Sequence, residues 1–316
     1  MEIARPHLLS LHPTMQCDYN CFNCYLKKDI TGDAIEKSPD FFMKLIEHAK
    51  KVGMTEVALA VNFMKKDDDF KLLDDPMPVW DSVDKNLYYF MWTRDKCREV
   101  GLEFTMTCNY DFIENYRDIL DFSDVALVSV SINDFVTSTP EKKKEAIETL
   151  RFLKTKVPIV NCNLLVSDAT VKQLNNGLDD EILAHADTIF LLFSAPLYIP
   201  LNKVYGQLKA MKHTILTMID ERVLLSTCIK REMDMSGGVC NMHEQIFVNP
   251  YGEIKLCSYD TRNLFVLQAP EDLEHVYQNL YPAKPLLTCD LINGKLVAEN
   301  RKKAMDMDKI LRVKNV

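Results

Sequence analysis

Six short runs rich in apolar and β-branched residues alternate with helical patterns over the first two thirds of the 316-residue chain. The run at 56–63 is almost continuously apolar, which is typical of a strand buried on both faces of a parallel sheet. Strands that alternate with helices indicate βαβ units. The sequence therefore predicts an α/β chain whose sheet forms an open, partial (β/α)6 TIM-like barrel. The predicted strands cover residues 7–12, 56–63, 103–108, 125–132, 157–166 and 188–194.

The helical patterns between these runs carry start and stop residues. Ser38 and Pro39 predict the beginning of the first helix, as N-cap and first-turn proline, and Gly53 predicts its end. The βα rhythm stops near residue 220. We therefore expect a core domain over 1–220 and a smaller, cysteine-containing domain over 221–316. The other predicted helices lie near 83–100, 114–121, 141–156, 171–186 and 203–219.

Composition and charge exclude several classes of protein. Hydrophobic residues make up 47% of the chain and charged residues 27%, as in ordinary globular proteins. No segment has the eighteen or so uninterrupted apolar residues of a membrane span, and Arg5, Pro6 and His7 stand where a secretory signal would need its apolar region. A net charge of −8 argues against a general nucleic-acid-binding surface. We expect a cytoplasmic protein without a membrane segment. The Lys- and Arg-rich tail at 295–316 fits a solvated helix and leaves a local RNA contact open.

Three cysteines follow the first predicted strand. Cys17, Cys21 and Cys24 lie in the run Cys-Asp-Tyr-Asn-Cys-Phe-Asn-Cys, so one short loop brings three thiolates together. Thiolates are soft ligands that suit zinc or iron–sulfur clusters. A structural zinc site usually has four protein ligands, and His12 is the only nearby candidate for a fourth. Three ligands can instead hold a 4Fe-4S cluster and leave one iron open. The spacing favours this cluster, with zinc as the alternative.

This spacing resembles the cluster motif of the radical S-adenosylmethionine (radical SAM) enzymes. The resemblance implies that S-adenosylmethionine (SAM) binds the open iron through its amino and carboxylate groups. It also implies reductive cleavage of SAM to a 5′-deoxyadenosyl radical, which abstracts hydrogen from a substrate. The family fold is a partial barrel with the cysteine loop directly after the first strand, as expected here. The electron would come from a low-potential donor such as ferredoxin or flavodoxin.

A second set of cysteines lies in the last third of the chain. The segments 245–248 and 253–256 predict a β-hairpin, and the turn at 249–252 has Asn first, Pro second and Gly fourth, which suits type I geometry. Cys240, eleven residues, a glycine, four residues and Cys257 form a pattern similar to the opening of the auxiliary-cluster domain in SPASM and twitch radical SAM enzymes. The dense later cysteines of a full SPASM domain are missing, so the resemblance implies one second 4Fe-4S cluster in a shortened twitch-like domain. Zinc ligation and simple core packing stay open. The implied ligands are Cys228, Cys240, Cys257 and Cys289.

The end of the second predicted strand departs from the family pattern. Relatives have a glycine-rich motif there, with a glutamate that helps to hold the amino group of SAM, whereas this chain has Ala60, Val61 and Asn62. The amide oxygen of Asn62 could still accept from an ammonium, although without the charge the contact is weaker. The alternative is that Asn62 bonds to the following loop.

Other polar residues in the fourth and fifth predicted strands are candidate cofactor contacts. Ser131, Asn133 and Asp134 occupy the stretch that in relatives contacts the methionine or ribose part of SAM. Asn161 and Asn163 interrupt an apolar strand, and a buried polar side chain needs a hydrogen-bond partner. A bound cofactor would provide one, and so would helix capping or loop bonding.

Two cysteines and one loop are further candidates. Cys108 and Cys162 lie in the third and fifth predicted strands, and a thiol at the barrel mouth could donate a hydrogen atom to a substrate radical. Burial is the common alternative for an unligated cysteine, and we expect it for Cys97. The long, Asp-rich connection at 64–82 is either a lid or substrate loop or a solvated excursion.

The sequence predicts a radical SAM enzyme with a catalytic cluster on the first three cysteines. By analogy with relatives that have auxiliary domains, the expected substrate is a peptide or protein. A nucleotide, a tRNA base or a small metabolite is the alternative within the same class. A different class also stays open, namely a non-catalytic zinc or iron–sulfur protein that keeps the fold, and the missing glutamate is its support.

Overall fold

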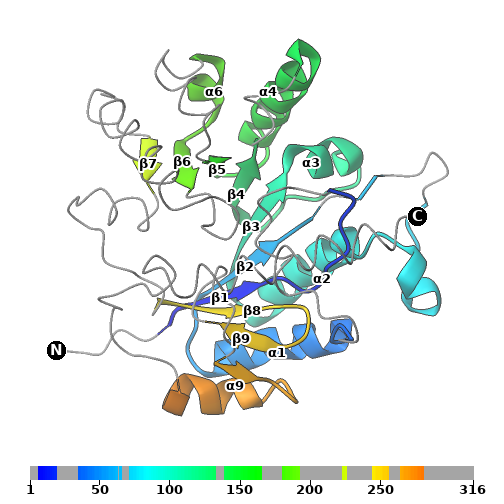
Figure 1. Cartoon of the computed structure of the whole chain (residues 1–316), viewed down its shortest axis with the longest axis vertical. Helices are drawn as coiled ribbons and strands as arrows, with labels where there is room; N and C mark the ends of the chain where they lie inside the picture. The colour runs from blue at the N-terminus through cyan, green and yellow to red at the C-terminus, as the bar shows by residue number, and fades with distance from the viewer. Residues whose placement is uncertain are drawn as a thin grey trace, which may run out of the picture.

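One mixed sheet organises the chain. The computed structural model describes residues 6–19, 35–62, 64–65, 71–132, 139–165, 180–192, 223–225, 244–255 and 264–280. In that part, ten strands form one sheet in the order β10-β9-β8-β1-β2-β3-β4-β5-β6-β7. All neighbours from β8 to β7 pair in parallel, and β9 and β10 add an antiparallel edge. In Figure 1 the sheet curves from β9 at the bottom to β7 at the upper left, and it is open.

The six predicted strands are all present, and they pair in sequence order. The α/β prediction of an open, barrel-like parallel sheet is therefore confirmed. The strands are β1 (Leu8–Leu11), β2 (Glu56–Ala60), β3 (Glu103–Asn109), β4 (Val125–Ser131), β5 (Ile159–Leu165) and β6 (Thr188–Leu192).

Helices follow the strands and lie on the outer side of the curved sheet (Figure 1). The predicted cap of the first helix is confirmed, because Ser38 Oγ accepts a hydrogen bond from the backbone N–H of Phe41 (3.3 Å). Gly101 ends the second helix with φ 72°, in the left-handed region that favours glycine. The helices are α1 (Pro39–Lys51), the 3-10 helix η2 (Met77–Ser82), α2 (Lys85–Val100), α3 (Tyr110–Tyr116), α4 (Pro140–Lys154) and α6 (Asp180–His185).

One predicted helix position is wrong. The helix expected at 114–121 begins at Tyr110 and ends at Tyr116. The reason is the side chain of Asn109, the last residue of β3, whose Oδ1 accepts from the backbone N–H of Asp111 (3.2 Å) and caps the helix directly at the strand end. Of the helix expected at 171–186, the described part is α6, and the helix expected at 203–219 lies outside the described residues.

The hydrophobic core fills the space between the sheet and these helices. Leu9, Val57, Phe104 and Val125 stand side by side on neighbouring strands and are fully buried or nearly so. Burying such a side chain stabilises the fold by roughly 1.5–3 kcal/mol. The helix-covered face of the sheet is therefore closely packed, which fixes the positions of the strand ends.

Strands from the last third of the chain extend this same sheet. The predicted hairpin is present as β8 (Gln245–Val248) and β9 (Glu253–Lys255), and its turn is tied by Asn249 Oδ1, which accepts from the backbone N–H groups of Tyr251 and Glu253. Gly252 has φ 77° at the fourth turn position. The hairpin pairs with β1, and a division of the chain near residue 220 stays a prediction. The remaining elements are β7 (Val223–Leu225), β10 (Phe265–Val266), α9 (Asp272–His275) and the π-helix η5 (Val276–Leu280).

None of the described helices is both long enough and apolar enough to cross a bilayer.

Candidate functional site

Polar side chains gather on the inner face of the sheet, toward the carboxyl ends of β3, β4 and β5. The strand register places Thr107 beside Ser129 and Ser129 beside Asn161, and two residues further along each strand it aligns three more polar residues. Because side chains alternate between the faces of a strand, all six share the face away from the helices. We call these six residues the polar rows: Thr107, Ser129 and Asn161, then Asn109, Ser131 and Asn163.

The opposite face of the same strands holds the two cysteines predicted as hydrogen-atom donors. Cys108 pairs in register with Val130, and Val130 with Cys162, and all three are buried in the hydrophobic core. Burial raises the pKa of both thiols far above the ordinary value. These cysteines therefore lie where packing alone would place them and not on the face of the polar rows. Cys97 is likewise buried on α2, as expected.

The chain that leaves β1 toward the cysteine loop is anchored on both sides of Cys17. Gln16 donates through Nε2 to the Val83 carbonyl (2.8 Å) and accepts at Oε1 from the backbone N–H of Lys85 (2.7 Å), so it is tied to the beginning of α2. On the other side, Asp18 Oδ2 accepts from the backbone N–H of Lys65 (2.7 Å). Cys17 itself is exposed. The first ligand of the predicted cluster thus follows β1 in the chain and lies between two anchored residues.

A second anchor joins this loop to the third βα unit. The hydroxyl of Tyr19 donates a hydrogen bond to Asp111 Oδ2, and Asp111 lies in the first turn of α3. The cap on Asp111 comes from Asn109, a member of the polar rows. The cysteine loop is therefore linked through two side chains to the carboxyl end of β3.

Asn62, just past the end of β2, is held in one orientation by its neighbours. Its Nδ2 donates to the Thr14 carbonyl (3.1 Å) and to Nε2 of His12 (3.0 Å), and its backbone N–H donates to Asn86 Oδ1 (2.9 Å). A carbonyl can only accept, so Thr14 fixes which end of the amide is the NH2 group. Both amide hydrogens are thus used, and the amide oxygen is left as an acceptor.

His12 supports this arrangement only as a neutral ring. The side chain is buried, and burial lowers its pKa from 6.5 to about 4. A neutral imidazole has one ring nitrogen that accepts, and here Nε2 faces the amide hydrogens of Asn62. His12 is therefore engaged within the fold, away from the role of a fourth zinc ligand.

Asn161 carries a buried oxygen without a partner. Its Oδ1 has no exposed surface and accepts no hydrogen bond within the described structure. A buried acceptor without a donor costs roughly 1–3 kcal/mol. A donor supplied by a bound molecule would remove this cost. The polar rows thus have the unmet hydrogen-bonding capacity that a cofactor site needs.

Comparisons with known proteins identify the fold. No family model matches the chain, and no curated protein matches it in sequence. Among solved structures, Streptococcus suis SuiB bound to precursor peptide SuiA matches with a TM-score of 0.59 and 15% identity, over 88% of this chain and 66% of that chain. SuiB bound to S-adenosylmethionine matches with a TM-score of 0.57 and 16% identity, over 88% of this chain and 67% of that chain. Histidine-tagged anSMEcpe with bound AdoMet matches with a TM-score of 0.54 and 13% identity, over 98% of both chains. These proteins are radical SAM enzymes.

The chain has the radical SAM fold. The resemblance read from the cysteine spacing is thereby confirmed at the level of the fold, and the cysteine loop follows β1 as predicted. The chain spans about two thirds of the length of SuiB.

Several of the site residues that the sequence predicts lie outside the described part of the chain. Asn62, Ser131, Asn161 and Cys17 are described, and the structure brings Ser131 and Asn161 to one face of the sheet. The described residues leave out most of the predicted ligands, and among them no group of three or more metal-ligating side chains occurs. The residues outside are Cys21, Cys24, Asn133, Asp134, Cys228, Cys240, Cys257 and Cys289.

Sequence reasoning missed the residues that hold the loop. Gln16 and Asn86 are examples, since Asn86 Nδ2 donates to the Gln16 carbonyl (3.1 Å). Gln16 stands directly before Cys17, which is the one signal that could have drawn attention to it. Lys255 was also missed, although it is a buried lysine two residues before Cys257, with Nζ 3.5 Å from Glu253 Oε2.

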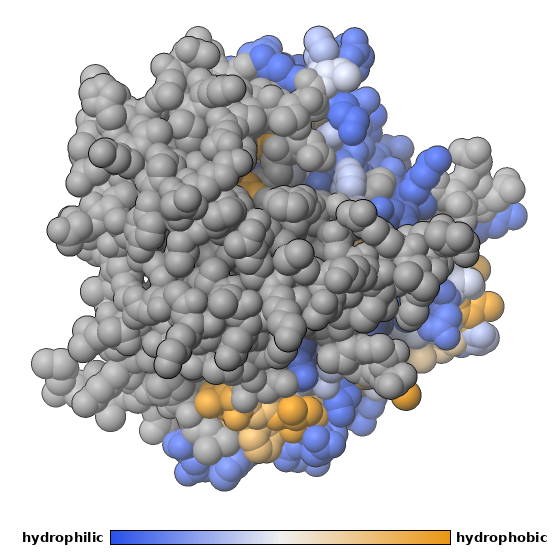
Figure 2. Space-filling view, in the orientation of Figure 1, coloured by the Kyte–Doolittle hydropathy of each residue, from blue (hydrophilic) through white to orange (hydrophobic). Residues whose placement is uncertain are grey.

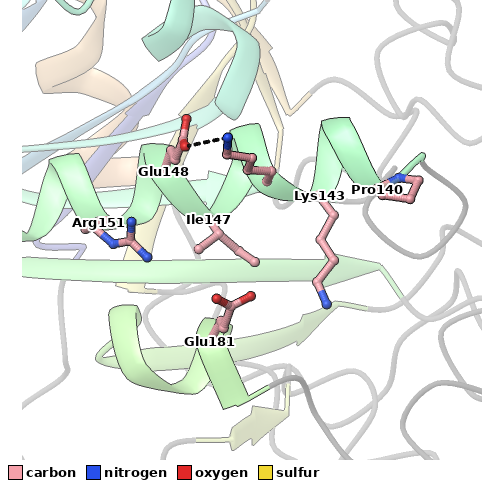
Figure 3. A pocket seen from close by; sticks show the side chains of 7 residues that line it. Pro140, Lys143, Ile147, Glu148, Arg151 and Glu181 are labelled. Carbon is pink, nitrogen blue, oxygen red and sulfur yellow. Dashed lines mark ion pairs between the residues drawn. The ribbon is translucent and has the colours of Figure 1, made fainter.

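A pocket of about 400 Å³ lies apart from the polar rows, between α4 and α6 (Figure 3). Lys143, Lys144 and Arg151 line it, but so do Glu148 and Glu181. Lys144 pairs with Glu148 at 3.7 Å. The two carboxylates thus offset most of the positive charge of the lining residues. No member of the polar rows lines this pocket, so it is not part of the candidate site.

Proposed function

We propose that this chain is a radical SAM enzyme that cleaves SAM reductively and abstracts hydrogen from a substrate. The observation that carries the proposal is the radical SAM fold, with Cys17 exposed in the stretch of chain that follows β1. In this proposal Cys17, Cys21 and Cys24 hold a 4Fe-4S cluster. That cluster, when bound and reduced, supplies the electron that converts SAM into methionine and a 5′-deoxyadenosyl radical.

The chain's own residues would bind and orient SAM. The free amide oxygen of Asn62 would accept from the ammonium group, in place of the glutamate found in relatives. The buried oxygen of Asn161 and the hydroxyl of Ser131 would bond to other polar groups of SAM, together with Asn133 and Asp134. Because the contact at Asn62 is neutral, we expect weaker SAM binding than a carboxylate would give.

A second 4Fe-4S cluster on Cys228, Cys240, Cys257 and Cys289 is part of the proposal. Its support is the β8–β9 hairpin, which turns back at Gly252 and so returns the chain toward its starting point before Cys257. We infer a shortened twitch-like domain from this hairpin and the cysteine count.

We propose a peptide or protein as the substrate. The support comes from the fold neighbours, since SuiB is seen with a precursor peptide and anSMEcpe with the Cp18Cys peptide. The latter structure matches with a TM-score of 0.50 and 12% identity. The electron would come from a ferredoxin or a flavodoxin, and the cell compartment would be the cytoplasm.

Anaerobic purification tests the proposal. The expected protein is brown, holds about four irons per intact cluster, and forms 5′-deoxyadenosine when reduced in the presence of SAM. Cys21→Ala should abolish this cleavage, whereas Cys240→Ala should leave the first cluster in place. A colourless protein with stoichiometric zinc after anaerobic reconstitution would refute the proposal and favour the non-catalytic alternative. Loss of both clusters in Cys240→Ala would contradict two independent sites.

The substrate class needs its own measurement. Incubation with SAM, reductant and candidate peptides should give a peptide whose mass changes with consumption of SAM. If instead a nucleotide, a tRNA or a small metabolite stimulates 5′-deoxyadenosine formation and peptides do not, the peptide assignment is wrong while the radical SAM assignment stands.

A further inference from the structure

A second pocket, of about 560 Å³, lies outside the polar rows. Three segments form it: residues 35–39 at the beginning of α1, Met77, Trp80 and Asp81 of η2, and Lys85 at the beginning of α2. Gln16, the residue before Cys17, also lines it. Its volume is within the range of small-ligand pockets.

The back wall of this pocket is a packed aromatic cluster. Trp80 stacks on Trp92 with ring centroids 5.5 Å apart, and its edge meets Tyr89 at 5.5 Å. Lys85 Nζ lies 5.6 Å from the centre of the Trp80 ring. Because Tyr89 belongs to the hydrophobic core, Trp80 is held in place from behind. The wall is therefore a preformed apolar surface.

Two residues that line the pocket leave large apolar side chains in water, since Ile35 is 88% exposed and Met77 50%. On the adjoining segment 71–82, Val79, Leu72 and Leu73 are also exposed, and Leu73 is tied to the aromatic cluster because its N–H donates to Tyr88 Oη (2.8 Å). Figure 2 shows hydrophobic side chains at the right-hand edge of the molecule, where the cyan segment around residue 80 lies in Figure 1. Gathered apolar side chains of this kind mark a binding surface.

The segment 71–82 beside the pocket is acidic, whereas the pocket lining carries two carboxylates, Glu36 and Asp81, and two lysines, Lys37 and Lys85. Asp74, Asp75 and Asp81 are exposed on the segment 71–83, against the single exposed Lys71. The Asp81 side chain is 96% exposed, and its pair with Lys85 (3.2 Å) is a surface ion pair, which contributes little. Lys85 also pairs with Glu36 at 3.4 Å, so its charge is already balanced. The partner that complements this surface is apolar and basic.

We propose that the aromatic pocket and the segment 71–82 bind an extended peptide that carries apolar side chains flanked by Lys or Arg. An apolar side chain enters between Ile35, Met77 and Trp80, and the basic residues face Asp74, Asp75 and Asp81. This deepens the peptide assignment and rests on the proposed function for the role of the peptide, although binding itself requires neither cluster nor SAM. A peptide held here lies next to Gln16, the residue before Cys17.

Tryptophan fluorescence gives a direct test, since the chain has two tryptophans and both belong to this cluster. The probe is the synthetic peptide Lys-Arg-Leu-Phe-Arg-Lys, titrated into the full-length protein under anaerobic conditions, with calorimetry as a second measurement. The comparison peptides are Glu-Asp-Leu-Phe-Asp-Glu and Lys-Arg-Ser-Ser-Arg-Lys. We expect a saturable change with the first peptide and at least ten-fold weaker binding of the other two. Equal binding of all three, or no saturable binding of the first, overturns the proposal.

Matched variants locate the binding. Met77→Ser and Asp81→Asn should each weaken binding of the basic peptide at least five-fold. The controls are Val266→Ser, at another exposed apolar side chain, and Glu145→Gln, at an exposed carboxylate on α4, and both should bind as the unmodified protein does. Controls that lose binding as strongly as the pocket variants overturn the proposal.

The same preparations separate this proposal from the proposed function. Formation of 5′-deoxyadenosine is measured in parallel, without peptide. Peptide binding without SAM cleavage would refute the radical SAM proposal alone, and SAM cleavage without peptide binding would refute the docking surface alone.

Discussion

His12 should stay neutral down to a pH far below the ordinary pKa of a histidine side chain. Burial lowers its pKa from 6.5 to about 4, a difference of about 2.5. Since one pKa unit corresponds to 1.36 kcal/mol, protonating His12 costs about 3 kcal/mol more in the folded chain than in water. The cause is burial, because a charged imidazolium loses its hydration when the ring is taken out of water.

This shift makes stability depend on pH in a defined window. Above pH 6.5 both the folded and the unfolded chain hold a neutral His12. Below it the unfolded chain binds a proton, whereas the folded chain does not until about pH 4. Proton binding therefore stabilises the unfolded state relative to the folded state as the pH falls from 6.5 to 4. The free energy of unfolding drops by up to about 3 kcal/mol from this residue alone.

The assay is a pH titration by NMR of protein with 13C-labelled histidine rings. His12→Gln removes one signal and so assigns it, and the exposed His7 serves as the comparison through His7→Gln. The His12 signal should keep the chemical shift of a neutral ring down to about pH 5. A His12 signal that titrates near pH 6.5 would refute both the burial argument and the fixed orientation of the Asn62 amide.

Four further substitutions test the packing and the caps. Ser38→Ala removes the N-cap of α1 and should cost about 1 kcal/mol of stability, measured by thermal unfolding. Asn249→Ala removes the acceptor for two backbone N–H groups in the hairpin turn and should cost roughly 2 kcal/mol in the same assay. Tyr116→Phe leaves the buried carboxylate of Asp84 without its 2.8 Å donor and should cost roughly 1–3 kcal/mol, while the raised pKa of Asp84 rises further. Cys162→Ala should leave the rate of 5′-deoxyadenosine formation and of substrate turnover unchanged, and a large loss of turnover would contradict its placement in the core.

The strands were predictable from sequence because their signal is local. A run such as 56–63 is apolar except at Glu56 and Asn62, and its length is typical of a strand and too short for most helices. The N-cap at Ser38 and the turn at 249–252 are likewise written in neighbouring residues. Asn109 was missed as a cap because the strand and the helix meet at that residue, without the loop that usually separates the two patterns.

The facing of side chains in a buried strand is harder to predict. Cys108 lies between Thr107 and Asn109, and either alternation would have been acceptable, since both faces of a central parallel strand are covered. The orientation of the Asn62 amide depends on Thr14 and His12, which are about fifty residues away in sequence. The aromatic pocket wall similarly joins Trp80 to Trp92 across the beginning of α2. Contacts of this kind exist only once the chain is folded.

Asn161 links the stability of the fold to the proposed chemistry. The residues on either side of it, Val160 and Cys162, belong to the closely packed face and fix the strand. Its own side chain is therefore confined to the inner face, between Ser129 and Thr188 in register, where no described donor reaches the amide oxygen. Helix capping and loop bonding are the alternatives for a buried asparagine, and no described residue supplies either to that oxygen. An unmet acceptor in this place fits a donor that arrives with a ligand, as the proposed function requires.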